Sequence, residues 1–156
     1  MTDPKILAQS IRQNVSGPMW HGPSINEALD GLTYVAANSR PVAGAHSVWE
    51  IALHIASWAD IARTRLGPAI MRDPVRSKDW PPVPAPSPGA WRQAIEQIGS
   101  AYDALANQVE WLKPEDLARI VPGRDYTVET MLRGVIEHGA YHAGQIAILR
   151  KALIKR

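Results

Sequence analysis

A proline-rich stretch separates two strongly helical parts of the sequence and restricts how they can be joined. Residues 72–89 read RDPVRSKDWPPVPAPSPG, with six prolines between positions 74 and 88. Proline lacks a backbone donor and favours extended chain, so this stretch is predicted to be extended. A segment of this length can cross a helical bundle from end to end. The helices before and after it can then run parallel, which short loops would not allow.

Helical periodicity of apolar residues appears in four segments and predicts an all-α fold, a four-helix bundle. No sustained alternation with a period of two is present, so no strands are expected. The predicted helices cover about residues 3–15, 47–66, 87–112 and 127 to nearly the C-terminus.

Local signals set the predicted ends of these helices. The pattern S-x-x-E at residues 47–50 is a capping box, and the same pattern at 24–27 predicts one short additional helix. Ser87 followed by Pro88 suits a helix start, and Pro114 is expected to end the third helix.

Composition limits the class of protein. A chain of 156 residues with 46% hydrophobic residues can bury the core of a single domain, which we expect to span residues 1–156. There are no cysteines, which excludes disulfides and thiolate ligands, and Lys plus Arg exceed Asp plus Glu only by 17 to 15. No basic patch indicates nucleic-acid binding, and no apolar run approaches ~18 residues. We expect a cytoplasmic protein without a membrane or nucleic-acid partner.

Three of the five histidines fall on predicted apolar helix faces. His138 and His142 are one helical turn apart, and His54 lies on the inward stripe of the second helix. Three inward imidazoles on two helices match what a three-histidine metal site requires. The alternative is that each ring is an ordinary core residue with its own hydrogen-bond partner. The pattern alone leaves both readings open.

Other polar residues are weaker candidates. Glu137 precedes His138 but points about 100° away around the helix, so a solvent-exposed position is expected. Glu50 is either the helix cap or an acceptor for an imidazole N–H, and Gln145 either hydrogen-bonds near the site or packs against another helix. His46 lies too far along the helix from His54 to share an ion with it, and His21 is expected on the surface.

The segments PMWHGPSINEALDGL, AHSVWEIALHIASW and VPGRDYTVETMLRGVIEHGAYHAGQIAILRKA together resemble the DinB superfamily. The resemblance implies a four-helix bundle of up-down-down-up order, usually dimeric, with a divalent metal held by His54, His138 and His142. Relatives often carry an acidic residue where this chain has Gly139. That residue would point off the metal face, so its absence puts in doubt a contact around the ligands or at the surface, and not the three histidines.

The resemblance leaves the function open. All-nitrogen ligation suits zinc, nickel, iron or copper better than magnesium or calcium, and affinity order does not choose among them. Of these four metals we expect zinc or nickel. The preferred interpretation is a metal-dependent S-transferase that uses a low-molecular-weight thiol. No general base is visible between the paired histidines, and a metal-bound thiolate needs none. A metal-dependent hydrolase and a non-catalytic, metal-stabilised bundle protein remain alternatives, since a fold does not fix a reaction. We also expect a two-fold homodimer packed through helix faces.

Overall fold

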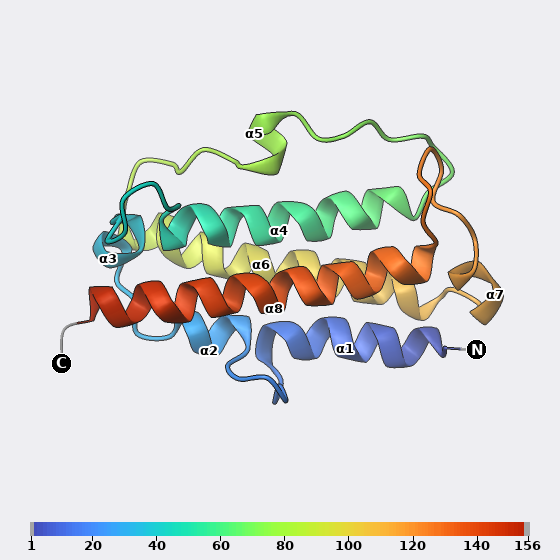
Figure 1. Cartoon of the computed structure of the whole chain (residues 1–156), viewed down its shortest axis with the longest axis horizontal. Coiled ribbons are helices and arrows are strands. Elements are labelled where there is room, and N and C mark those ends of the chain that lie inside the picture. Colours follow the sequence, from blue (N-terminus) through green and yellow to red (C-terminus); the bar gives the residue numbers. More distant parts are fainter. Residues whose placement is uncertain (1, 155–156) are drawn as a thin grey trace.

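The computed structural model describes residues 2–154, and these residues are almost entirely helices and loops (Figure 1). The helices are α1 (Pro4–Ser16), α2 (Ile25–Leu29), α3 (Tyr34–Asn38), α4 (Val48–Arg65), α5 (Arg76–Asp79), α6 (Pro88–Glu110), α7 (Pro114–Leu117) and α8 (Val128–Leu153). Two isolated bridges are the only β-type pairings among the described residues. The all-α expectation is confirmed.

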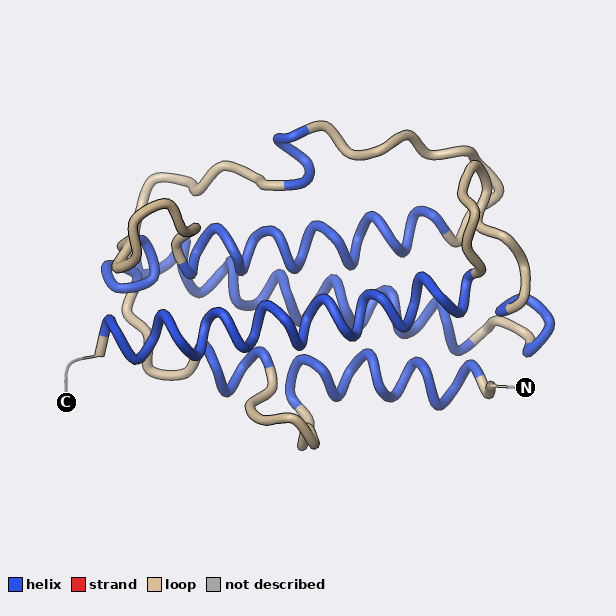
Figure 2. The backbone as a smooth tube through the Cα atoms, in the orientation of Figure 1, coloured by secondary structure: helices blue, strands red, loops and turns tan. Residues whose placement is uncertain are grey.

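The four long helices lie side by side, with α4 and α6 running in one direction and α1 and α8 in the other (Figure 1). Helices α1 and α4 each pack against both α6 and α8, and the short α2 packs against α8. The proline-rich segment runs back along the outside of α4, from its end to the start of α6 (Figure 2). Between residues 2 and 154, no helix has both the length and the apolarity that crossing a bilayer requires.

Helix starts follow the local signals in the sequence. Helices α2 and α4 begin with complete capping boxes, in which the serine side chain accepts from the third backbone N–H and the glutamate accepts from the cap N–H. Helix α6 begins at Pro88 after the cap Ser87, and α8 begins after the cap Thr127. Each boundary lies within about two residues of its predicted place.

The apolar faces of the long helices form one continuous core. Its largest fully buried side chains include Trp49, Ile55, Tyr102, Leu132 and Ile146. They come from α4, α6 and α8, so the helices that carry the candidate histidines are held by the core itself. A rigid support of this kind keeps the side chains of a site in fixed positions.

Three short helices were not predicted. Helix α5 forms one turn inside the proline-rich segment, because residues 75–80 contain no proline, so the extended prediction is wrong for this turn. The third long helix ends at Glu110, and Pro114 occupies the first position of α7, where its missing N–H has no cost. Helix α3 begins after the cap Thr33. Such short helices show too few residues for periodicity to reveal them.

Candidate metal centre

Helices α4 and α8 bring His54, His138 and His142 into one cluster. The Nε2 atom of His138 lies 3.0 Å from Nε2 of His54 and 3.1 Å from Nε2 of His142. The three residues each offer a ligand atom within 4.8 Å of the others, and two of the three rings are buried. The structure therefore joins the three histidines that the sequence singled out.

The outer nitrogens of two rings have fixed partners. His54 Nδ1 donates to the backbone carbonyl of Asp79 at 2.6 Å, and His142 Nδ1 donates to Oε1 of Gln145 at 2.6 Å. The amide of Gln145 in turn donates to the hydroxyl of Tyr141 at 3.0 Å. These bonds place the proton of each ring on Nδ1 and leave a lone pair on Nε2, the arrangement usual for metal-ligating histidines.

Three ring nitrogens consequently converge, with too few protons to form a hydrogen bond between each neighbouring pair. The Nε2 atoms of His54 and His142 are both acceptors, and both face Nε2 of His138, which carries at most one proton. Nδ1 of His138 is buried and has no hydrogen-bond partner within the described part of the chain. Ligands at ~2.0–2.1 Å from a tetrahedral ion lie roughly 3.3 Å apart, so small ring movements would accommodate one. The residues present fit a divalent cation.

Burial keeps all three rings neutral near pH 7. Burial, together with the neighbouring rings of His142 and His54, lowers the pKa of His138 from 6.5 to about 3. Burial lowers the pKa of His142 to about 4, although the bond to Gln145 opposes this shift. The pKa of His54 is also lowered by burial, against the opposing effect of Asp79. Neutral imidazole is the form that binds a metal.

These pKa directions predict that the metal-free protein loses stability as the pH falls from about 6.5 toward 4. In the unfolded chain the histidines take up protons near pH 6.5, whereas in the folded protein they stay neutral, so acid favours unfolding. Thermal melts of chelator-treated protein should show a Tm that decreases from pH 7 to pH 5. His138→Gln should flatten this decrease, and an equal slope in both proteins would contradict the explanation.

The segment around α5 covers the cluster from the outside. The indole of Trp80 stacks on the ring of His54 with 3.9 Å between centroids, and His46 stacks on the other face of Trp80 at 3.6 Å. The Trp58 indole N–H donates to Asp79 Oδ1 at 2.8 Å, and the hydroxyl of Ser57 donates to the carbonyl of Lys78. The proline-rich chain is thereby fixed to α4 beside the histidines.

Two cavities reach the cluster. One of about 380 Å³ extends along Trp58 toward the end of α4, and the other, of about 650 Å³, lies between Trp80 and Tyr141. Both are lined in part by His54 and His138. Each cavity therefore borders rings of the histidine cluster.

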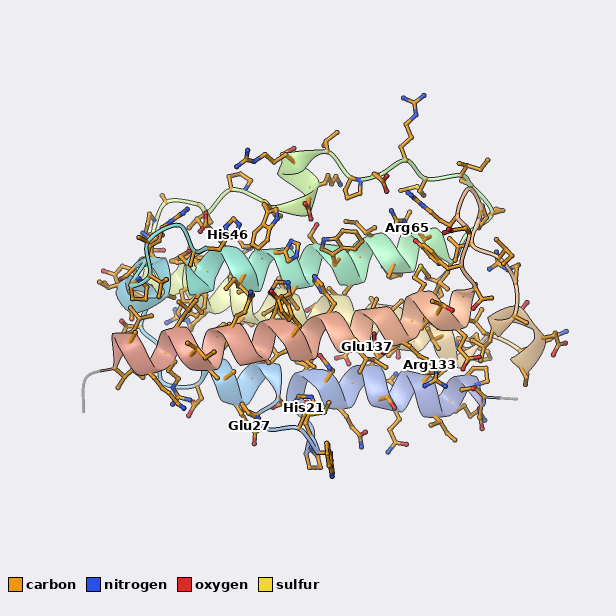
Figure 3. The ribbon with its side chains drawn as sticks, viewed as in Figure 1. His21, Glu27, His46, Arg65, Arg133 and Glu137 are labelled. Carbon is orange, nitrogen blue, oxygen red and sulfur yellow. The ribbon has the colours of Figure 1, made fainter. Side chains whose placement is uncertain are left out.

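The remaining sequence candidates have other positions. Glu50 completes the cap of α4 and pairs with Arg40, so it is not the acceptor of an imidazole N–H in the cluster. Gln145 hydrogen-bonds to His142 in the site, which confirms the first of its two predicted roles. Glu137 is exposed on α8, and His21 is exposed in the loop between α1 and α2, on the opposite side of the helices from α5 (Figure 3). His46 lies outside the histidine cluster.

Sequence reasoning missed three contributors to the site, namely Asp79, Trp80 and Trp58. The first two lie in the proline-rich segment, whose placement depends on tertiary contacts. The only local signal was the sequence KDW within a run of prolines, a short polar and aromatic interruption.

The fold and the site together define the class of protein. It is an all-α protein with three converging imidazoles that could hold a cation. The sequence profile of the DinB superfamily matches residues 21–146, and the chain belongs to this superfamily. The matched region includes all three histidines. Searches among curated proteins and among solved structures each returned no match.

Proposed function

We propose that the chain is a metal-dependent enzyme in which His54, His138 and His142 hold one divalent ion, zinc or nickel in preference to iron or copper. The convergence of three Nε2 lone pairs, two of them fixed by Nδ1 hydrogen bonds, is the observation that carries the proposal. The helix directions agree with the up-down-down-up four-helix bundle that the family resemblance implies.

A three-ligand set favours catalysis over a purely structural role. Structural zinc is usually closed by four protein ligands, whereas catalytic zinc keeps a position for water or substrate. The described residues provide three candidate ligands and no fourth His, Asp, Glu or Cys in the same group. The two adjoining cavities supply space for substrates.

The surroundings of the cluster favour transfer to or from a thiol over hydrolysis. A divalent ion bound there would lower the pKa of a coordinated thiol or water. Water attack commonly needs a general base nearby, but the carboxylate closest to the rings, Asp79, lies on the Nδ1 side of His54 and accepts from Trp58. The Glu50 carboxylate accepts from the cap N–H of α4, and Glu137 is exposed.

Two cavities also suit a reaction with two substrates. In the proposed step, a low-molecular-weight thiol loses its proton to solvent and its sulfur forms a bond to an electrophilic carbon of the second substrate. A leaving group then departs with the electron pair of its bond. When the acceptor is instead an activated alkene, the adjacent carbon takes up a proton from water. The chain's own residues hold the two substrates on either side of His54 and His138 and limit the access of water.

The test is turnover of a panel of low-molecular-weight thiols with electrophilic acceptors by zinc- or nickel-loaded protein. Thioether formation, followed by mass spectrometry, should disappear after chelation and in His142→Ala, and return when metal is added back to the wild type. His21→Ala, far from the cluster, is the matched control and should keep full turnover. Metal-dependent cleavage of esters or amides without thioether formation would favour the hydrolase. Full metal loading with neither reaction, and a large loss of Tm on chelation, would favour a stabilising role.

We also propose a cytoplasmic homodimer, as the family resemblance implies. Light scattering should give about twice the 17.1 kDa mass of one chain at micromolar concentration. The mass of a single chain would reject this.

A further inference from the structure

The 380 Å³ cavity has an apolar body with chemically different ends. At one end lie His54 and His138 of the cluster. Arg65, Tyr126 and Thr130 supply polar groups at the other end. The walls between them are largely apolar, and consist of Trp58, Ala62, Met131, Gly134 and Val135.

Arg65 is the unusual residue of this cavity. It is the last residue of α4 and is only 5% exposed. Its Nη1 donates to the hydroxyl of Tyr126 at 3.1 Å, and its guanidinium carbon lies 5.6 Å from the centre of the Trp58 ring. Its Nε has no hydrogen-bond partner among residues 2–154. Buried arginines are normally paired with an anion, because an uncompensated buried charge is costly.

Among the residues that the structure describes, Asp73 is the only carboxylate that contacts Arg65, and it does not neutralise the guanidinium. Asp73 lies 3.5 Å from Nη2 of Arg65 but 2.7 Å from Nη1 of Arg124, and its side chain is 80% exposed. One solvated carboxylate is thus shared by two guanidinium groups and lies closer to the other one. Positive charge remains in excess at this end of the cavity.

We propose that this cavity binds the acceptor substrate of the proposed reaction and that this substrate is a small organic acid with an apolar body. Its carboxylate pairs with Arg65 and takes a hydrogen bond from the Tyr126 hydroxyl, whose proton is free because its oxygen accepts from Arg65. The apolar body lies along Trp58, and the reactive end points to the histidines. Arg65 is then a specificity-determining residue. The statement that the bound acid is a substrate rests on the proposed function, but the anion site itself does not.

The distances suit a compact aromatic acid. The Trp58 ring centre lies 5.6 Å from the Arg65 guanidinium and 6.3 and 5.9 Å from the ring centres of His54 and His138. A single aromatic ring with a short acidic side chain can therefore reach from Arg65 to the cluster.

Calorimetric titration of the zinc-loaded protein with 3-phenylpropionate tests the proposal, with the neutral 3-phenylpropanamide as the matched ligand. The acid should bind at least about tenfold more tightly than the amide, and Arg65→Gln should remove this difference. Asp73→Asn, an exposed change that removes the competing carboxylate, should tighten binding of the acid. Arg133→Gln, on the exposed surface of α8, should leave binding unchanged.

Two results would overturn the anion site. One is that the wild type binds the acid and the amide equally well. The other is that Arg65→Gln and Asp73→Asn both leave the affinity for the acid unchanged. Acid binding that vanishes on chelation but survives Arg65→Gln would show that the carboxylate binds the metal instead. If Arg65→Gln does not fold, Tyr126→Phe tests the same pocket and should weaken the acid but not the amide.

Failure of the proposed function can be told apart from failure of this site. Zinc stoichiometry of Arg65→Gln should equal that of the wild type, because Arg65 is not a candidate ligand. Loss of turnover in every assay with acid binding intact would reject the enzyme and keep the anion site. Where turnover is found, 3-phenylpropionate should compete with the acceptor, and competition with the thiol alone would reject the acceptor assignment.

Discussion

His54→Ala is expected to abolish tight metal binding as completely as His142→Ala, although the two residues lie on different helices. Each contributes one of the three converging Nε2 atoms, so removing either leaves a two-nitrogen site. Loss of a residue that only orients a ligand typically weakens metal affinity 10–100-fold, and loss of a ligand should weaken it by more than about 100-fold. Metal analysis after dialysis, and calorimetric titration of the metal-free protein, measure the effect.

Two other histidines provide the controls. His21→Ala should retain full metal stoichiometry, because His21 is exposed in the loop between α1 and α2. His46→Ala should also retain it, since His46 stacks on Trp80 and is not one of the three clustered histidines. Circular dichroism should show that each variant is folded. Wild-type affinity in His54→Ala, with loss in His138→Ala, would replace the three-histidine site by a two-histidine one.

The parts of the fold that could be predicted depend on local chemistry. The main helices were placed nearly correctly from both capping boxes, the Ser87 cap and the long apolar stripes. Each of these signals lies within a few residues of the boundary it sets. Periodicity also predicted that His54, His138 and His142 face inward, since the inward face of a helix repeats every three to four residues.

The rest of the site depends on contacts that no local pattern encodes. A backbone carbonyl, that of Asp79, fixes the His54 ring, and any residue type could have supplied it. Trp80 reaches His54 only because irregular chain folds back over α4. Arg65 looks in the sequence like an ordinary basic residue in a last helical turn, and only the packing of Tyr126 and Trp58 around it shows that it is buried.

Gly139 illustrates the same limit. The sequence indicated correctly that this position faces away from the metal side, but it suggested a contact around the ligands or at the surface there. In the structure Gly139 is buried on a side of α8 that Asn14 of α1 and Tyr102 of α6 approach. A side chain at this position would therefore enter the core.

Gly139→Ala is expected to destabilise the protein by roughly 2–4 kcal/mol, although alanine is the better helix former. A Cβ at this position would lie 2.0 Å from Oδ1 of Asn14 and 2.8 Å from the hydroxyl of Tyr102. Asn14 is 2% exposed and donates to the carbonyl of Ile136 at 2.8 Å, so moving its amide away breaks a buried hydrogen bond. Denaturant unfolding of the metal-free protein measures the loss.

Gly144→Ala on the same helix is the matched control, because a Cβ there meets nothing within 4 Å. It should stabilise the protein by about 0.5–1 kcal/mol through helix propensity alone. The two substitutions are chemically identical and differ only in what surrounds them. If the clash with Asn14 is the cause, Gly139→Ala should cost less when Asn14 is already alanine, because the oxygen at 2.0 Å is then gone. A gain in stability from Gly139→Ala similar to that from Gly144→Ala would mean that α8 does not approach Asn14 and Tyr102 this closely.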